Sequence, residues 1–174
     1  SDDSFLRHSK YFFVDGDVTF LVNGFLYCVH RHLFSRDSAY FSTRFAQLEV
    51  SDHEASSTII SLGDIECEDF EAFLSVLYPE CFEERDVSYE QWRSVLHLST
   101  RWGFTSLREL ALRSIKPPTP CDRLILARTY AVDHWVVPAL TALCKRTTPL
   151  SPDEVGQMND GDVVLVATVR EDIR

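Results

Sequence analysis

The pattern of hydrophobic and polar positions changes its period near the start of the chain. Every second residue is apolar over residues 18–22 and again over 25–29, as expected for strands with one buried face. The pair Asn23-Gly24 separates the two runs and favours a two-residue hairpin turn. From there the apolar residues recur every three or four positions, which predicts a helix over residues 31–45. The sequence therefore predicts a hairpin that leads directly into a helix.

Two further strands are predicted on either side of this region. Tyr11–Val14 is a short apolar run, and Thr58–Leu62 is rich in β-branched residues, which favour strands. Residues 1–10 are polar, so we expect them to be loose or to form a short helical lead-in. Glu49–Ser57 is polar and acidic, which is typical of a surface loop.

The rest of the chain has helical periodicity with clear start and stop signals. Apolar residues at helical spacing predict a helix over Asp69–Tyr78, and Pro79 ends it. Serine followed three residues later by Gln or Glu is a capping box, which marks a helix start. Capping boxes at Ser88, Ser106 and Ser151, together with the caps Thr119 and Asn159, predict that helices begin at these five residues. The spacing of Val136, Leu140 and Leu143 predicts one further helix.

The best candidate for a domain boundary is the proline-rich segment Lys116–Pro120, because each proline restricts the residue before it. We therefore expect a domain over residues 1–116 and a helical C-terminal extension over 117–174, packed on it. Strands at the start and helices afterwards indicate an α+β fold, with a small sheet packed on helical hairpins.

Composition and charge limit the classes of function. The 174 residues are 45% hydrophobic and carry a net charge of −10, which would repel a nucleic-acid backbone. No apolar run approaches the roughly 20 residues that span a bilayer, and no secretion signal is visible. The five cysteines are scattered and odd in number, which fits a reducing compartment. We therefore expect an intracellular protein that binds neither nucleic acid nor membranes directly.

One cluster of residues leaves an enzymatic alternative open. Cys28-x-His30-x-His32 would place three metal-ligating side chains on one face if all three lay on a strand, and His134 could join them in a small metal-dependent or hydrolytic enzyme. The helical pattern begins near His32, however, and would turn that residue away. The sequence has no Gly-x-Ser-x-Gly elbow and no phosphate-binding glycine loop, so catalysis is the less favoured interpretation.

Asp17 and Arg31 form a second candidate pair. Asp17 precedes the hairpin and Arg31 follows it, so the two residues can lie close in space. They could form a structural ion pair of small energetic value, or they could line a groove at an interface. The residues alone leave both interpretations open.

Several motifs together resemble the BTB/POZ domain signature. The resemblance spans about residues 11–115. Additional likenesses at Asp15-Gly16-Asp17, Tyr78-Pro79 and 126–130 are similar to BTB proteins of basidiomycete fungi, which carry a short helical tail. The motifs that match the domain signature are Asp17-Val-x-Phe-x-Val, Phe25-x-x-x-Val-His-Arg-x-Leu-Phe-x-Arg-x-Ser-x-Tyr-Phe41, Ile60-x-Leu-x-Asp-Ile65, Asp69–Tyr78, and Leu98–Phe104 with Leu110; the corner Trp102-Gly103-Phe104 is a further likeness to the basidiomycete group.

The resemblance implies a protein interaction module without catalysis or cofactor. Its partners would be a second copy of the chain, another BTB protein, a transcriptional regulator or a cullin ubiquitin-ligase scaffold. In the family, Asp17, His30 and Arg31 match residues at a groove beside the dimer interface. Val50 and Asp52 match, weakly, a hydrophobic-x-acidic element that binds cullins. No zinc fingers or kelch repeats follow in this sequence.

Overall fold

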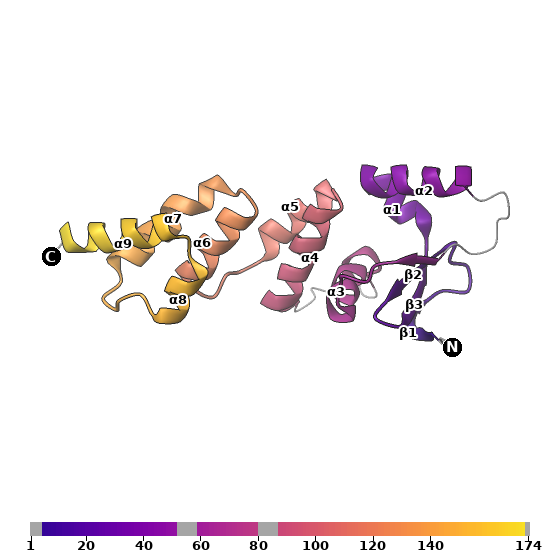
Figure 1. Ribbon diagram of the computed structural model, residues 1–174, viewed down its shortest axis with the longest axis horizontal. Coiled ribbons are helices and arrows are strands. Elements are labelled where there is room, and N and C mark those ends of the chain that lie inside the picture. The colour runs from indigo at the N-terminus through magenta and orange to yellow at the C-terminus, as the bar shows by residue number, and fades with distance from the viewer. Residues whose placement is uncertain (1–4, 52–58, 80–86, 173–174) are drawn as a thin grey trace. The chain divides into compact units, whose positions relative to one another are not determined.

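The computed structural model describes residues 5–51, 59–79 and 87–172, which fall into two compact units, residues 1–115 and 116–174. The described part of the N-terminal unit is a four-stranded sheet with helices packed on it (Figure 1). Its elements are β1 (Leu6–Phe12), β2 (Val18–Val22), β3 (Phe25–Val29), α1 (Arg31–Asp37), α2 (Ala39–Ser51), β4 (Ile59–Ser61), α3 (Cys67–Leu77), α4 (Tyr89–Arg101) and α5 (Thr105–Ser114).

The strands follow the order β1-β3-β2-β4, so β1 and β4 are the edges of the sheet. β2 and β3 form the antiparallel hairpin, while β1 and β4 run parallel to their neighbours. Asn23 and Gly24 take positive φ angles of 43° and 83°, as this kind of tight turn requires. The predicted hairpin and the predicted α+β fold class are both confirmed.

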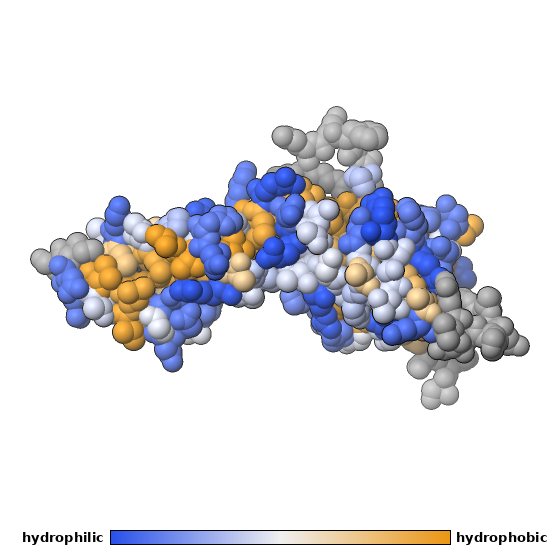
Figure 2. Space-filling model, turned by 90° about the horizontal axis from the view of Figure 1, so that it is seen from above, coloured by the Kyte–Doolittle hydropathy of each residue, from blue (hydrophilic) through white to orange (hydrophobic). Residues whose placement is uncertain are grey.

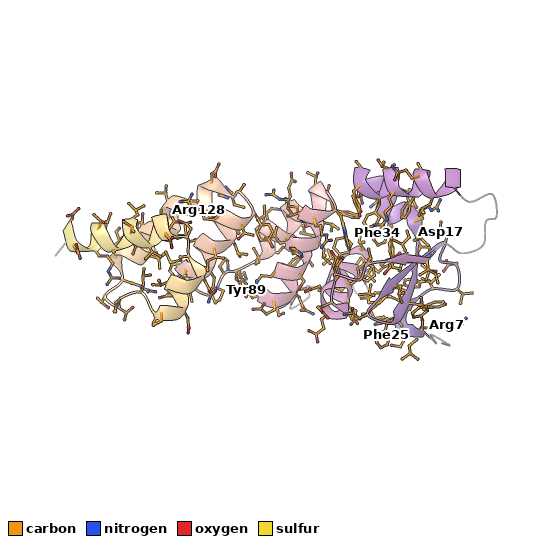
Figure 3. All side chains as sticks on the ribbon, in the orientation of Figure 1. Arg7, Asp17, Phe25, Phe34, Tyr89 and Arg128 are labelled. Carbon is orange, nitrogen blue, oxygen red and sulfur yellow. The ribbon has the colours of Figure 1, made fainter. Side chains whose placement is uncertain are left out.

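An aromatic core fills the space between the sheet and the helices. Phe34 of α1 is fully buried, and its ring centre lies 5.0 Å from those of Phe20 and Phe41. Figure 3 labels Phe34 beside the sheet. The other fully buried large side chains described in this core are Tyr27, Phe70, Phe73, Leu74, Leu98 and Phe104, and Trp102 is 2% exposed.

The prediction for the N-terminal residues was wrong, because β1 begins at Leu6 and ends at Phe12. The pairing between β1 and β3 shifts register between Arg7 and Phe12, which indicates a bulge. His8 holds this bulge: its Nδ1 atom accepts the backbone N–H groups of Lys10 and Tyr11 at 3.2 and 3.0 Å. An edge strand with a bulge does not show regular apolar alternation, which explains why the pattern failed here.

Glu71 of α3 fixes the other side of the His8 ring. His8 Nε2 lies 3.1 Å from Glu71 Oε1, and the Tyr27 hydroxyl donates to the same oxygen at 3.3 Å. The His8 ring also stacks on Tyr27, with ring centres 4.6 Å apart. Burial raises the pKa of Tyr27, and contacts with Cys67 and Glu71 raise it further. These contacts attach β1 to the sheet and to α3.

The single helix predicted over residues 31–45 is two helices. Ser38 is extended, with φ −136° and ψ 114°, and separates α1 from α2. Its buried hydroxyl donates to the Trp102 carbonyl at 2.6 Å and accepts the Phe41 N–H at 3.1 Å. A serine that caps a new helix and bonds a distant backbone group therefore breaks the periodic run. α2 continues to Ser51, so the predicted loop over 49–57 starts too early, and its residues 52–57 lie outside the described part.

One of the two capping boxes in this unit is confirmed. Ser88 accepts the Gln91 N–H at 3.2 Å, and Gln91 accepts the Ser88 N–H at 3.0 Å, at the start of α4. The prediction that Ser106 caps the next helix was wrong, because α5 begins at Thr105 and the residue at its N-cap position is Phe104. Gly103, at φ 69°, ends α4, and the buried Phe104 then fixes where the next helix starts.

The secondary structure described in the C-terminal unit consists of helices joined by short connections. Its elements are α6 (Pro120–Thr129), α7 (Asp133–Lys145), α8 (Pro152–Gln157) and α9 (Asp160–Asp172). The predicted caps Thr119, Ser151 and Asn159 each accept the backbone N–H three residues later. The helix predicted for the tail is thus confirmed. A separate core is formed by Cys121, Leu124, Ala139, Leu143, Met158 and Val166.

Candidate interaction site

Asp17 lies just before β2 and contacts the start of α1. Its backbone N–H donates to the Val29 carbonyl at 2.9 Å, and its Oδ1 atom accepts the Arg31 backbone N–H at 2.5 Å. A carboxylate at a helix N-terminus satisfies an amide that has no partner within the helix, and it interacts favourably with the helix dipole. Asp17 therefore joins the hairpin to α1 (Figure 3).

The Arg31 side chain extends over α2. Its guanidinium carbon lies 4.9 Å from the centre of the Phe45 ring, within the range of a cation–π contact. The structure thus brings Asp17 and Arg31 together through the Arg31 backbone, while the guanidinium contacts an aromatic ring of the next helix. Asp17 is exposed and Arg31 is half-buried, so this corner presents a carboxylate beside a cation.

His30 precedes α1 and binds the end of α3. Its backbone N–H donates to the Tyr78 hydroxyl at 2.9 Å, and its Nδ1 atom lies 3.1 Å from the same oxygen. The hydroxyl can accept the amide proton and donate its own proton to Nδ1, which leaves Nε2 to face Asp15 Oδ2 at 3.4 Å. The ring also packs against Phe13, with centres 5.2 Å apart.

Tyr78 is the residue of this corner that the sequence did not single out as a site residue. Its hydroxyl joins α3 to the start of α1 across 48 residues of sequence. Burial raises its pKa, and the nearby Asp17 and Asp15 carboxylates act in the same direction, against the lowering effect of the His30 amide. In the sequence, Tyr78 before Pro79 indicated only where the helix ends, and no signal indicated the contact with His30.

Val50 and Asp52 are the residues of the predicted cullin-type element. Val50 lies in the last turn of α2, but its side chain is outside the described part, and so is Asp52. The predicted contact of these two residues with a cullin therefore stays a prediction.

The residues of the enzymatic alternative belong to different parts of the structure. Cys28 lies on β3 against Gly16, where an added Cβ would approach the cysteine sulfur to 2.7 Å. His30 contacts Tyr78, and His32 is exposed on α1. His134 belongs to α7 of the other unit. Within residues 5–51, 59–79 and 87–172, no three His, Cys, Asp or Glu side chains form a group that could hold a metal ion. This arrangement gives no support to a catalytic cluster.

Among the helices of the described segments, none has both the length and the apolar character needed to cross a bilayer.

The described N-terminal unit thus combines a four-stranded sheet, the helices α1 and α2 after the hairpin, α3 and the helical hairpin α4–α5. A comparison with family profiles finds the BTB/POZ domain over residues 6–117. The chain therefore belongs to the BTB/POZ domain family, whose domains are protein–protein interaction modules. A comparison with curated proteins gave no match.

Proposed function

We propose that this chain is a non-enzymatic interaction module that forms homodimers through the β1 edge of its sheet. The observation that carries this proposal is an exposed apolar surface at that edge. Phe5, Leu6 and Phe25 are 41%, 61% and 37% exposed. Leu6 pairs with Phe25 in the sheet register, so the three side chains belong to neighbouring positions. Exposed apolar residues that gather on an edge strand indicate an interaction surface.

The β1 edge is also held in a fixed conformation before any partner binds. The Leu6 N–H donates to the Gly24 carbonyl at 3.0 Å, and His8 is attached to Glu71. Arg7, labelled with Phe25 in Figure 3, places its guanidinium carbon 4.8 Å from the Phe12 ring centre. A preformed surface loses less conformational entropy on association than a loose one. These contacts support β1 as the strand that meets a second copy.

Leu6→Asp is expected to weaken self-association at least about tenfold, because it places a charge at the centre of the apolar surface. Light scattering of the full chain at several concentrations measures this. Ile59→Asp is the matched control, since Ile59 is a 45% exposed apolar residue on β4, the opposite edge. A wild-type monomer at high micromolar concentration would contradict the proposal, as would a dimer that Ile59→Asp dissociates and Leu6→Asp does not.

We further propose that Asp17, His30 and Arg31 line a groove beside this interface. Three contacts support a formed site at this corner. They are the hydrogen bond from the Arg31 backbone N–H to the Asp17 carboxylate, the guanidinium over Phe45, and the His30–Tyr78 pair. A carboxylate, an imidazole and a guanidinium on neighbouring positions can bind a partner through polar contacts that fix its orientation.

Arg31→Glu is expected to weaken the homodimer severalfold, because a second carboxylate would then lie beside Asp17 and near the partner copy. Light scattering again provides the measurement, with far-UV circular dichroism as the check on folding. His32→Glu is the control, since His32 is the next residue of α1 and is exposed. If Arg31→Glu dimerises as the wild type does, the groove does not lie beside the interface.

Three further parts of the proposal concern the group of BTB proteins to which the chain belongs, its location in the cell and its other partners. The four helices after residue 117 support our proposal that residues 117–174 form a helical extension like that of basidiomycete BTB proteins. The described cysteines, Cys28, Cys67, Cys121 and Cys144, are free thiols, which supports an intracellular location. We propose a cullin scaffold or a transcriptional regulator as further partners on the resemblance alone.

A further inference from the structure

We propose that the outer face of α9 binds a basic amphipathic helix of a partner protein. This site lies in the C-terminal unit, and it is separate from the homodimer surface proposed above. We define the α9 outer face as Gly161, Val164, Leu165 and Thr168, with Asp160, Glu171 and Asp172 at its two ends.

α9 is apolar on two opposite sides. Its inner side is accounted for, because Val166 is fully buried and Val163 packs on the same core. On the outer side, Val164 is 63% exposed and Leu165 is 45% exposed. At 3.6 residues per turn these two residues flank Gly161 and Thr168 on one stripe. An exposed apolar stripe on a helix whose other side already packs in a core indicates an interaction surface. Figure 2 shows hydrophobic surface over the part of this unit that contains α7 and α9.

Polar contacts near both ends hold α9 in place. Near its N-terminus, the buried Asp162 accepts two bonds from the Arg128 guanidinium of α6, at 2.9 and 2.7 Å. Near its C-terminus, Arg170 donates to the carbonyls of Leu143, Thr147 and Thr148 at 3.3, 3.2 and 2.7 Å. Figure 3 labels Arg128 beside α9. The outer face is therefore a rigid platform, and binding to it requires little ordering of the protein.

The negative charge at both ends of the α9 outer face favours a basic partner. Asp160, Glu171 and Asp172 are exposed at its ends. Arg170 is the one basic residue of α9, and its guanidinium is directed to backbone carbonyls instead. Glu171 and Asp172 also lie at the C-terminus of the helix, where the dipole disfavours negative charge. Cations from a partner would relieve this repulsion.

The same charges argue against a second copy of the chain as the occupant. In an antiparallel pair of α9 helices, Asp160 would face Glu171 and Asp172 of the other copy. In a parallel pair, each acidic end would face its own counterpart. Like charges oppose association in either direction. A helix with apolar residues every three or four positions and Lys or Arg near its ends fits both the stripe and its flanking carboxylates.

The test uses the full chain and a synthetic peptide as the probe. The peptide is acetylated, amidated and fluorescein-labelled, with about 14 residues, leucine at helical spacing and lysine elsewhere, which matches the length of α9 at about 20 Å. Fluorescence anisotropy measures its affinity. We expect binding by the wild type and a loss of at least about tenfold in Leu165→Asp, because a central apolar contact is removed. Glu171→Lys with Asp172→Lys should weaken binding and reduce its salt dependence.

Matched controls separate this site from unspecific attraction. Val155→Asp changes a similarly exposed valine on α8 and should leave the affinity unchanged. Leu165→Ala removes apolar area without adding charge and should also weaken binding. No binding by the wild type overturns the proposal, as does equal binding of a peptide with the same residues in non-helical order. A loss in Val155→Asp equal to that in Leu165→Asp overturns it as well. If Leu165→Asp dissociates the homodimer, a second copy covers the face and the proposal is wrong, whereas failure of the β1 interface leaves it intact.

Discussion

Phe34→Ala is expected to lower the free energy of unfolding of the N-terminal unit by about 3–5 kcal/mol. Phe34 is fully buried, and its ring contacts those of Phe20, Phe41, Phe73 and Phe104. Truncation removes the transfer free energy of the ring and leaves a cavity that the neighbouring rings can fill only in part. Edge-to-face contacts between aromatic rings are lost as well.

Urea unfolding followed by hydrogen exchange and mass spectrometry measures this loss in each unit separately. Such resolution matters because two units with separate cores need not unfold in one step. Phe25→Ala is the control, since Phe25 is 37% exposed and should cost about 1 kcal/mol or less. Peptides from residues 116–174 should keep their protection in both variants. A Phe34→Ala protein as stable as Phe25→Ala would show that Phe34 does not hold the core together.

Local sequence signals predicted the elements that depend on neighbouring residues. The Asn23-Gly24 turn and the Ser88 cap each need residues within a few positions, and both are confirmed. The prediction failed where distant contacts decide the structure. Ser38 breaks a helical pattern because it bonds Trp102, which lies 64 residues away. His8 turns a polar segment into a strand because Glu71 binds its ring.

At the candidate site, the sequence likewise indicated which residues are present but not how distant elements bring them into contact. The resemblance to the family supplied Asp17, His30 and Arg31, and Asp17 does lie against the start of α1. The contact of Arg31 with Phe45 and that of His30 with Tyr78 depend on how α2 and α3 pack beside the hairpin. No spacing along the chain encodes those distances. The exposed Leu6 and Phe25 could be recognised as a pair only once the register of β1 was known.

Acidification from pH 5 to pH 2 is expected to remove about 3 kcal/mol of stability from the C-terminal unit, through Glu154. Arg146 donates to the two oxygens of this carboxylate at 2.6 and 2.5 Å. Both side chains are mostly buried, at 23% and 20% exposed. The guanidinium, assisted by the Ser151 N–H, lowers the pKa of Glu154 from 4.5 to about 2 against the opposing effect of burial.

The sign of the pH dependence follows from this lowered pKa. Above pH 4.5 the carboxylate is charged in both states, and the folded state gains the full interaction. As the pH falls from 4.5 toward 2, the unfolded chain binds the proton first, so protonation favours unfolding. Asp162 acts in the same direction, because its bonds from Arg128 lower its pKa too.

Glu154→Gln isolates this contribution. Glutamine can still accept the Ser151 N–H and keep the capping box, but it cannot form the ion pair. The variant should be about 2–3 kcal/mol less stable than the wild type at pH 7 and equally stable near pH 2. Asp153→Asn is the control, since Asp153 is an exposed acid in the same helical turn. Urea titrations followed by ¹⁵N-HSQC spectra of the full chain at pH 7, 5, 4, 3 and 2 resolve residues 116–174. A constant stability difference between Glu154→Gln and wild type across these pH values would rule out the ion pair as the source of acid lability.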